Sequence, residues 1–262
     1  MKKNKMINSH VYLARSILNK FSYRGKNNAH MIKYIDTNDM IIKEKSTKKF
    51  NSELGYYSYN NEQLLKNNIE EKIGIIIHKL EENRKNNITD FVLLEKDKFY
   101  LTTYLAYQWL RSESLVENIK KHFNLDIRSN YLKNELINEE NTTNLIGSKT
   151  CDMDICILFN NSNKGFVINS SNSLLYKDSH DYYIITLVLT PNIAVRFCKE
   201  DILKQVFSLE NNYMVISITD DNSIINENIR TYNAAYKSTP GFIVGKESDL
   251  IDILNIVSNK KD

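Results

Sequence analysis

The stretch from residue 62 to residue 84 has the hydrophobic spacing of an amphipathic helix. Apolar side chains recur there at intervals of three or four positions, which places them on one face of a helix. They are Leu65, Ile69, Ile73, Ile76, Ile77 and Leu80. The sequence therefore predicts a long helix with one buried face.

A second long helix is predicted for residues 97–123, and its hydrophobic face carries two polar residues. The positions expected to be buried are Leu101, Tyr104, Leu105, Gln108, Arg111 or Ser112, Leu115 and Ile119. Burying an unpaired amide costs roughly 1–3 kcal/mol, and burying an unpaired charge costs more. Gln108 and Arg111 must therefore find partners in the folded chain, and a carboxylate is the expected partner.

The N-terminal part predicts a helix followed by a small hairpin. Ser9 is expected to cap the helix, and Gly25 to end it. Its apolar stripe consists of Ala14, Ile17, Leu18 and Phe21. Residues 30–35 and 39–45 are expected to form two short antiparallel strands.

After residue 150 the pattern changes to short runs of β-branched and aromatic residues, separated by Asn, Asp, Ser and Gly, which predict an antiparallel sheet. The runs lie at residues 156–159, 165–168, 182–189 and 214–218. The remaining elements are a helix at 224–236, a strand at 242–244 and a closing helix at 248–257, capped by Ser248. The expected fold class is α+β, a single domain over residues 1–262 with a helical half at about 1–140 and a strand-rich half at about 150–262.

Charge is distributed unevenly along the chain. Residues 1–50 contain twelve Lys and Arg against three Asp and Glu, a net charge of +9 within a chain whose total is +3. Such a basic segment attracts a nucleic acid backbone or an anionic lipid surface, and a solvated lysine face is an equally good interpretation. No window contains 18 consecutive apolar residues, so no membrane partner is expected.

The three cysteines, Cys151, Cys156 and Cys198, do not form the even-numbered framework of a disulfide-rich protein, and a cytoplasmic location is expected. Cys151 and Cys156 lack a second pair or a neighbouring histidine at zinc-ligand spacing. The chain also lacks the Walker glycine loop, GxGxxG, GxSxG and HExxH. No metal and no cofactor is expected.

A family resemblance is carried by six segments in one order. The run Arg15-Ser16-Ile17-Leu18-Asn19-Lys20-Phe21-Ser22 resembles the opening of the bacterial domain-of-unknown-function 4238 family, where a His-Tyr-Val-Pro-Arg type stretch leads to Leu-x-x-Phe. The other segments similar to that family are Tyr56-Tyr57-Ser58, Ile69-Glu70, Gln108-x-x-Arg111, Val167-Ile168-Asn169-Ser170 and Leu189-Thr190-Pro191. The resemblance covers nearly the whole chain.

The resemblance implies which segments correspond to those of the family and in which biological setting the protein acts, but it implies no reaction. The family has no assigned activity, and its genes resemble parts of the mobile or phage-defence repertoire of bacteria. Two positions depart from its pattern. Val11 takes the place of the family's histidine, with His10 one residue earlier, and Ser170-Ser171-Asn172-Ser173 lacks the acid and the proline of Ser-Asp-Asn-Pro.

Two hypotheses of different classes follow from the polar residues. Glu70 borders the apolar stripe of the first long helix and is expected to face Arg111, with Gln108 binding the remaining carboxylate lone pair. In the first hypothesis Glu70, Gln108, Arg111 and Arg15 line a cleft of an effector enzyme, best described as a metal-independent nuclease, with the basic segment as its nucleic acid track. In the second, the same residues form a buried structural clasp in a non-enzymatic recognition or partner-binding protein that uses some of its 16 tyrosines for contacts.

Overall fold

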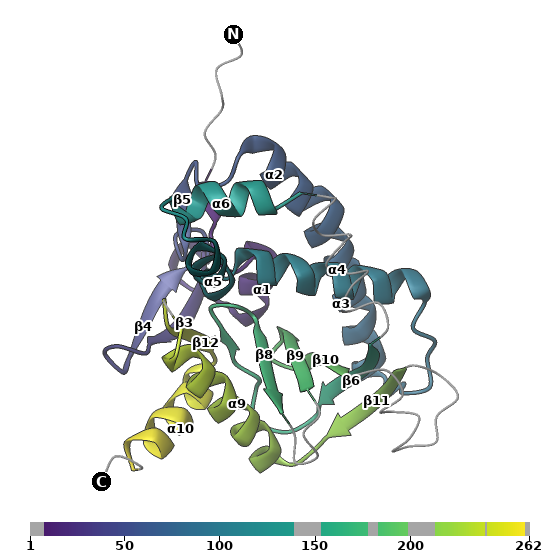
Figure 1. Cartoon of the computed structure of the whole chain (residues 1–262). Helices are drawn as coiled ribbons and strands as arrows, with labels where there is room; N and C mark the ends of the chain where they lie inside the picture. The colour runs from purple at the N-terminus through teal and green to yellow at the C-terminus, as the bar shows by residue number, and fades with distance from the viewer. Residues whose placement is uncertain (1–7, 139–152, 178–182, 199–212, 239, 260–262) are drawn as a thin grey trace.

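A computed structural model describes residues 8–138, 153–177, 183–198, 213–238 and 240–259 (Figure 1). Its N-terminal part contains β1 (Asn8–His10), α1 (Arg15–Leu18), η1 (Asn19–Phe21), β2 (Tyr23–Arg24), η2 (Lys26–Asn28), β3 (His30–Asp36), β4 (Ile41–Ser46) and β5 (Ser52–Leu54). The hairpin of β3 and β4 confirms the prediction for residues 30–45. The two strands pair antiparallel from Met31 with Ser46 to Asp36 with Ile41.

The N-terminal helix is shorter than the sequence predicts. Ser9 lies in β1, which pairs with β5, and the helix begins only at Arg15 without a side-chain cap. The Ser9 hydroxyl accepts a hydrogen bond from the Tyr57 backbone at 3.2 Å, so it caps no helix. The prediction that Ser9 begins this helix is therefore wrong, although Ile17, Leu18 and Phe21 are buried as expected.

The first long helix agrees with its predicted stripe. It runs without interruption through α2 (Tyr59–Gln63), η3 (Leu64–Glu70), which is π-helical, and α3 (Glu71–Lys85). All six apolar positions of the predicted stripe are at most 5% exposed. The Ser58 hydroxyl caps the start by accepting from the Asn61 backbone at 3.2 Å.

The second long helix is two helices, α4 (Glu95–Arg111) and α5 (Glu113–Phe123), followed by α6 (Ser129–Leu136). Ser112 separates α4 from α5 because its ψ of 137° is extended. Its hydroxyl accepts from the Leu115 backbone at 3.4 Å, as an N-cap does. The prediction of one helix over residues 97–123 is wrong, and the break places Arg111 at the end of α4.

The C-terminal part contains β6 (Asp154–Asn160), β7 (Ile168–Asn169), β8 (Ser173–Lys177), β9 (Tyr183–Thr190), β10 (Ile193–Cys198), β11 (Tyr213–Ile218), α9 (Asp221–Tyr236), β12 (Phe242–Gly245) and α10 (Glu247–Ser258). One sheet has the order β11-β6-β10-β9-β8. It is mixed and not wholly antiparallel as predicted, because β11 runs parallel to β6. Helix α10 begins after Lys246 without a side-chain cap, so Ser248 lies within the helix.

The two predicted halves are interleaved in space. A second sheet has the order β2-β3-β12-β7, with β4 on β3, so strand β12 from the C-terminal end pairs with the N-terminal hairpin. One large apolar cluster includes side chains from both ends of the chain, for example Leu13 and Val244. The fold is α+β, and Figure 1 shows α4 crossing near β8, with α5 and α6 beside it.

The junction between the hairpin and β12 leaves no room for a side chain at Gly241. Its carbonyl accepts from the backbone and the hydroxyl of Thr37 at 2.9 and 3.0 Å. An added Cβ would lie 2.2 Å from the Thr37 hydroxyl and 2.6 Å from the Ala235 carbonyl. This close approach joins the two ends of the chain.

We expect Gly241→Ala to lower the free energy of unfolding by about 1–3 kcal/mol, because backbone must move to admit the methyl group. Gly74→Ala is the matched control, since Gly74 lies in α3 with nothing within 4 Å of an added Cβ. That change should be neutral or stabilise by up to about 1 kcal/mol. Urea titrations measure both, and equal stabilities for the two variants would contradict the packing described at Gly241.

Candidate functional site

Arg111 is the centre of a polar cluster built from four segments. Its side chain is buried, with 2% of the residue exposed, and its Nη1 lies 3.5 Å from Glu70 Oε1. Its Nη2 donates to the His10 carbonyl at the end of β1, and its guanidinium lies 5.6 Å from the centre of the Tyr57 ring. A single side chain thus joins α4 to η3, β1 and the segment before α2.

Glu70, unlike Arg111, is partly exposed to solvent. It ends the π-helical stretch η3, a local irregularity that is frequent at functional sites. Its side chain is 20% exposed, and its Oε2 lies 3.5 Å from the Ser16 hydroxyl on α1. Ser16 thus takes the place expected for Gln108. The carboxylate lies between the buried guanidinium and the surface.

The electrostatics of the pair favour a charged arginine beside a carboxylate that protonates readily. Burial raises the pKa of Glu70 above its usual range, and Arg111 opposes this only in part. Burial also acts to lower the pKa of Arg111, but the neighbouring Tyr57 and Glu70 outweigh it and raise that pKa. Glu70 is therefore a stronger proton acceptor than a free glutamate.

His10 and Arg15 lie beside the pair, and the sequence had left the role of His10 open. Burial lowers the pKa of His10 to about 4, and the charges of Arg111 and Arg15 add to the effect. The imidazole is therefore neutral at pH 7. Arg15, the first residue of α1, is exposed, so it is the arginine of this cluster that can meet a ligand.

Gln108 is buried one turn before Arg111, with 1% exposed, and it makes no hydrogen bond to Glu70. It lies by Tyr104, whose hydroxyl accepts from the Asn172 amide at 3.2 Å. Burial of both Gln108 and Arg111 confirms the hydrophobic-face register of this helix. The sequence did not identify Tyr57, Tyr104 and Asn172 as site residues, because only the packing brings them to this cluster.

Several buried polar atoms around Arg111 have no hydrogen-bond partner within the described part of the chain. They are His10 Nδ1, Glu62 Oε1, both amide atoms of Gln108, Arg111 Nε and Asn172 Oδ1. Folded proteins leave few such atoms unpaired. The concentration of these atoms at one place, beside a partly exposed carboxylate, has the character of a site for a polar ligand or for ordered water.

The described residues contain no group of three or more His, Cys, Asp or Glu placed to hold a metal ion. Cys156 and Cys198 are both buried, and burial raises the pKa of the Cys156 thiol to about 12. Cys151 lies outside the described residues. The chemistry that this cluster supports on its own is proton transfer and anion binding.

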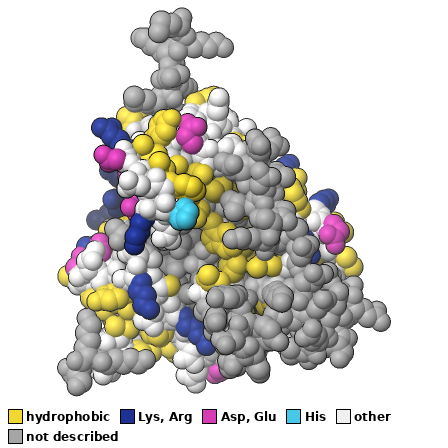
Figure 2. Space-filling view, viewed as in Figure 1, with side chains coloured by type: hydrophobic (Ala, Val, Ile, Leu, Met, Phe, Trp, Pro, Cys, Tyr) yellow, Lys and Arg dark blue, Asp and Glu magenta, His cyan; other side chains and the backbone are white. Residues whose placement is uncertain are grey.

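The basic N-terminal segment is partly neutralised. Lys20 pairs with Glu81, Lys33 with Glu44 and Glu247, and Lys43 with Asp39. On the face shown in Figure 2, Lys and Arg side chains stand apart from one another and form no continuous strip. Arg15, Lys48 and Lys49 are exposed, and no carboxylate in the described part of the chain pairs with them.

Five of the six segments that resemble that family lie at or beside this cluster. Arg111 contacts Tyr57 and Glu70, and the Arg15 segment adjoins Glu70 through Ser16. The Ser170 segment is followed by Asn172, which bonds to Tyr104. No protein-family model matches the chain, and searches of curated proteins and of solved structures found no match. In the described parts of the chain, no helix has the length and apolar character needed to cross a membrane.

The lowered pKa of His10 predicts an acid-sensitive contribution to stability. The unfolded chain binds this proton near pH 6.5 and the folded chain only near pH 4, so the contribution is present above pH 6.5 and is lost as the pH falls to 4. Between pH 7 and pH 4 we expect wild type to lose about 2 kcal/mol more than His10→Gln, allowing for partial exposure.

Urea unfolding at pH 7, 5.5 and 4 measures this difference. His78→Gln is the control, because the His78 side chain is 72% exposed; its profile should follow wild type. Parallel profiles for wild type and His10→Gln would show that the His10 imidazole is not buried beside the two arginines.

Proposed function

We propose that this chain is a nuclease-like enzyme that cleaves phosphodiester bonds by general acid–base catalysis without a metal ion. One observation carries the proposal: the Glu70 carboxylate has a raised pKa, is held by the buried Arg111 at 3.5 Å, and is still 20% exposed. A structural ion pair does not require such access. A general base does, because it must reach the proton that it removes.

The residues have distinct roles in this proposal. Glu70 accepts the proton of the attacking hydroxyl or water as the new P–O bond forms, and that proton passes to the leaving oxygen as the old bond breaks. Arg15 binds the phosphate. Neutral His10 has one ring nitrogen that donates and one that accepts a hydrogen bond. Arg111 and Gln108 are positioning residues, since both lie inside the protein.

Only a few residues of the basic segment form the nucleic acid track in this proposal. Lys48 and Lys49 are exposed and directly precede Phe50 and Asn51. Asn51 holds the chain next to His10, because its carbonyl accepts from Val11 N at 2.9 Å. We assign the track to Arg15, Lys48 and Lys49, because the segments that carry them both lie beside His10 and Val11.

The biological setting rests on the resemblance to the domain-of-unknown-function 4238 family, which we propose as the family of this chain. That resemblance suggests a bacterial effector encoded in a mobile element or a phage-defence locus. A cytoplasmic site of action is the matching expectation from the cysteine usage.

The second candidate is a non-enzymatic recognition protein in which the cluster is only a structural clasp. The burial of Arg111 and Gln108 to 2% and 1% favours it, because neither side chain can touch a substrate. Exposed aromatic residues such as Tyr59, Tyr131 and Tyr236 would then make the contacts. The two candidates differ in what the loss of the Glu70 charge does.

Replacing Glu70 by Gln tests both candidates, because it preserves the shape of the side chain and removes its proton-accepting ability. Cleavage of single-stranded RNA and DNA in EDTA should fall by about 100-fold or more in Glu70→Gln, with a melting temperature within a few degrees of wild type. Glu71→Gln is the matched control, since Glu71 is the next residue and is exposed. It should cleave like wild type.

If wild type cleaves no nucleic acid and Glu70→Gln only melts earlier, the enzyme proposal is wrong and the cluster is a structural clasp.

Nucleic acid binding gives a second readout of the proposed nuclease function. Wild-type affinity should fall steeply with salt, and Lys48→Gln with Lys49→Gln should reduce the slope by about 1.4–1.8, or about 0.7–0.9 for each contact. Lys33→Gln is the control, because Lys33 is already paired with two glutamates. An unchanged slope in the double variant would remove these lysines from the track.

A further inference from the structure

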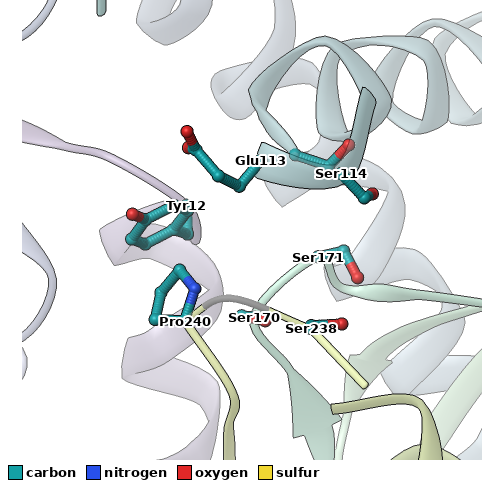
Figure 3. A pocket seen from close by; sticks show the side chains of 8 residues that line it. Tyr12, Glu113, Ser114, Ser170, Ser171, Ser238 and Pro240 are labelled. Atoms are coloured by element: carbon teal, nitrogen blue, oxygen red, sulfur yellow. The ribbon is translucent and has the colours of Figure 1, made fainter. Parts of the chain in front are cut away.

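A small pocket adjoins the Arg111 cluster, and its two sides differ in chemistry. Its volume is about 250 Å³, including its open mouth. Figure 3 shows the rings of Tyr12 and Pro240 on one side, and the hydroxyls of Ser171 and Ser238 on the other. A flat ligand with apolar faces and a polar edge matches this lining when it lies across the open mouth of the pocket.

The hydroxyls of the pocket are arranged mainly to accept hydrogen bonds. Ser171 donates its proton to Asn169 Oδ1 at 3.2 Å, and Ser238 donates to the Ala234 carbonyl at 2.8 Å. The lone pairs of both oxygens are left for a ligand that donates. Such a ligand carries O–H or N–H groups, whereas a phosphate, which only accepts, is poorly suited.

Ser170 is a nearly buried serine of the pocket lining. The residue is only 6% exposed and lines the pocket. A ligand hydroxyl that bonds to Ser170 would be largely shielded from water, where a hydrogen bond is electrostatically stronger than in solvent.

A buried lysine fixes the third wall of the pocket. Lys133 is 0% exposed, its Nζ lies 2.7 Å from Glu113 Oε2, and it lies 4.8 Å from the centre of the Tyr12 ring. The carboxylate of Glu113 and the face of Tyr12 are thus held before any ligand arrives. Preorganisation of this kind strengthens binding, because less side-chain freedom is lost.

The pocket is connected to the Arg111 cluster through three segments. Tyr12 follows His10 by two residues, and Ser112, which also lines the pocket, follows Arg111 directly. Ser170 and Ser171 precede Asn172, whose amide donates to Tyr104. Each of these pocket residues therefore lies one or two positions along the chain from a member of the Arg111 cluster.

We propose that this pocket binds a sugar ring that bears two adjacent hydroxyls, and that its source is the ribose of a ribonucleotide. A sugar has hydroxyl donors at its edge and apolar ring faces for Tyr12 and Pro240. The ribose 2′-hydroxyl is the group by which a protein distinguishes RNA from DNA. The assignment of RNA as substrate rests on the nuclease function proposed above, whereas the binding of the sugar does not.

Titration calorimetry with four probes tests the proposal: adenosine, 2′-deoxyadenosine, D-ribose and D-glucose. Adenosine should bind at least fivefold more tightly than 2′-deoxyadenosine, which corresponds to one lost hydrogen bond. Ser170→Ala, which removes only a hydroxyl, should weaken adenosine binding by a similar factor. Ser248→Ala is the control, because Ser248 is exposed on α10; it should bind like wild type.

Equal binding of adenosine and 2′-deoxyadenosine, or no effect of Ser170→Ala, would overturn the proposal. Glucose or ribose binding more tightly than adenosine would assign the pocket to a free saccharide and overturn the ribonucleotide source. Ribonucleoside binding without nuclease activity would overturn the proposed function and leave the pocket assignment standing. Glu70-dependent cleavage without ribonucleoside binding would overturn the pocket assignment and leave the proposed nuclease function standing.

Discussion

The buried guanidinium of Arg111 is the interaction on which the rest of this structure depends. It reaches a carboxylate on η3, a backbone carbonyl on β1 and an aromatic ring before α2, so three segments take their positions from one side chain. A buried charge without a partner is costly, and the fold must therefore keep all three contacts together. This constraint on the fold applies whether or not the protein is an enzyme, so it is common to both candidate functions.

The same constraint explains why a site arises at the edge of the core. Arg111 is closed off from solvent, but the Glu70 carboxylate that it holds is not, and the exposed Arg15 lies close by. The break at Ser112 ends α4 directly after Arg111 and turns the next residues toward the serine-lined pocket. The position of the Arg111 charge and the position of the adjoining pocket are therefore both determined by the point at which α4 ends.

The sequence predicted what depends on local spacing. The stripe from Leu65 to Leu80 identified the first long helix, and the cost of burying Arg111 required a carboxylate, which the structure supplies as Glu70. Residue spacing was a poorer guide to the ends of helices, which depend on backbone dihedral angles. The hydrophobic face continues through Ser112, so the break between α4 and α5 was missed, although Ser112 is a good N-cap.

Residue spacing could not predict contacts between segments that are distant in the sequence. The pairing of β12 with β3, and the parallel direction of β11 beside β6, depend on the path of the chain in space. The same holds for His10, whose position one residue before the family's histidine did not reveal its contact with Arg111. Tyr57 and Asn172 became part of the site for the same reason.

The most direct test of the central claim is the unfolding free energy of Arg111→Met beside that of Arg15→Met. Both changes remove one guanidinium from the same neighbourhood, but only Arg111 is buried. We expect a loss of about 3–5 kcal/mol for Arg111→Met and of less than about 1 kcal/mol for Arg15→Met. Equal, small losses in both variants would contradict the claim that a buried Arg111 organises this fold.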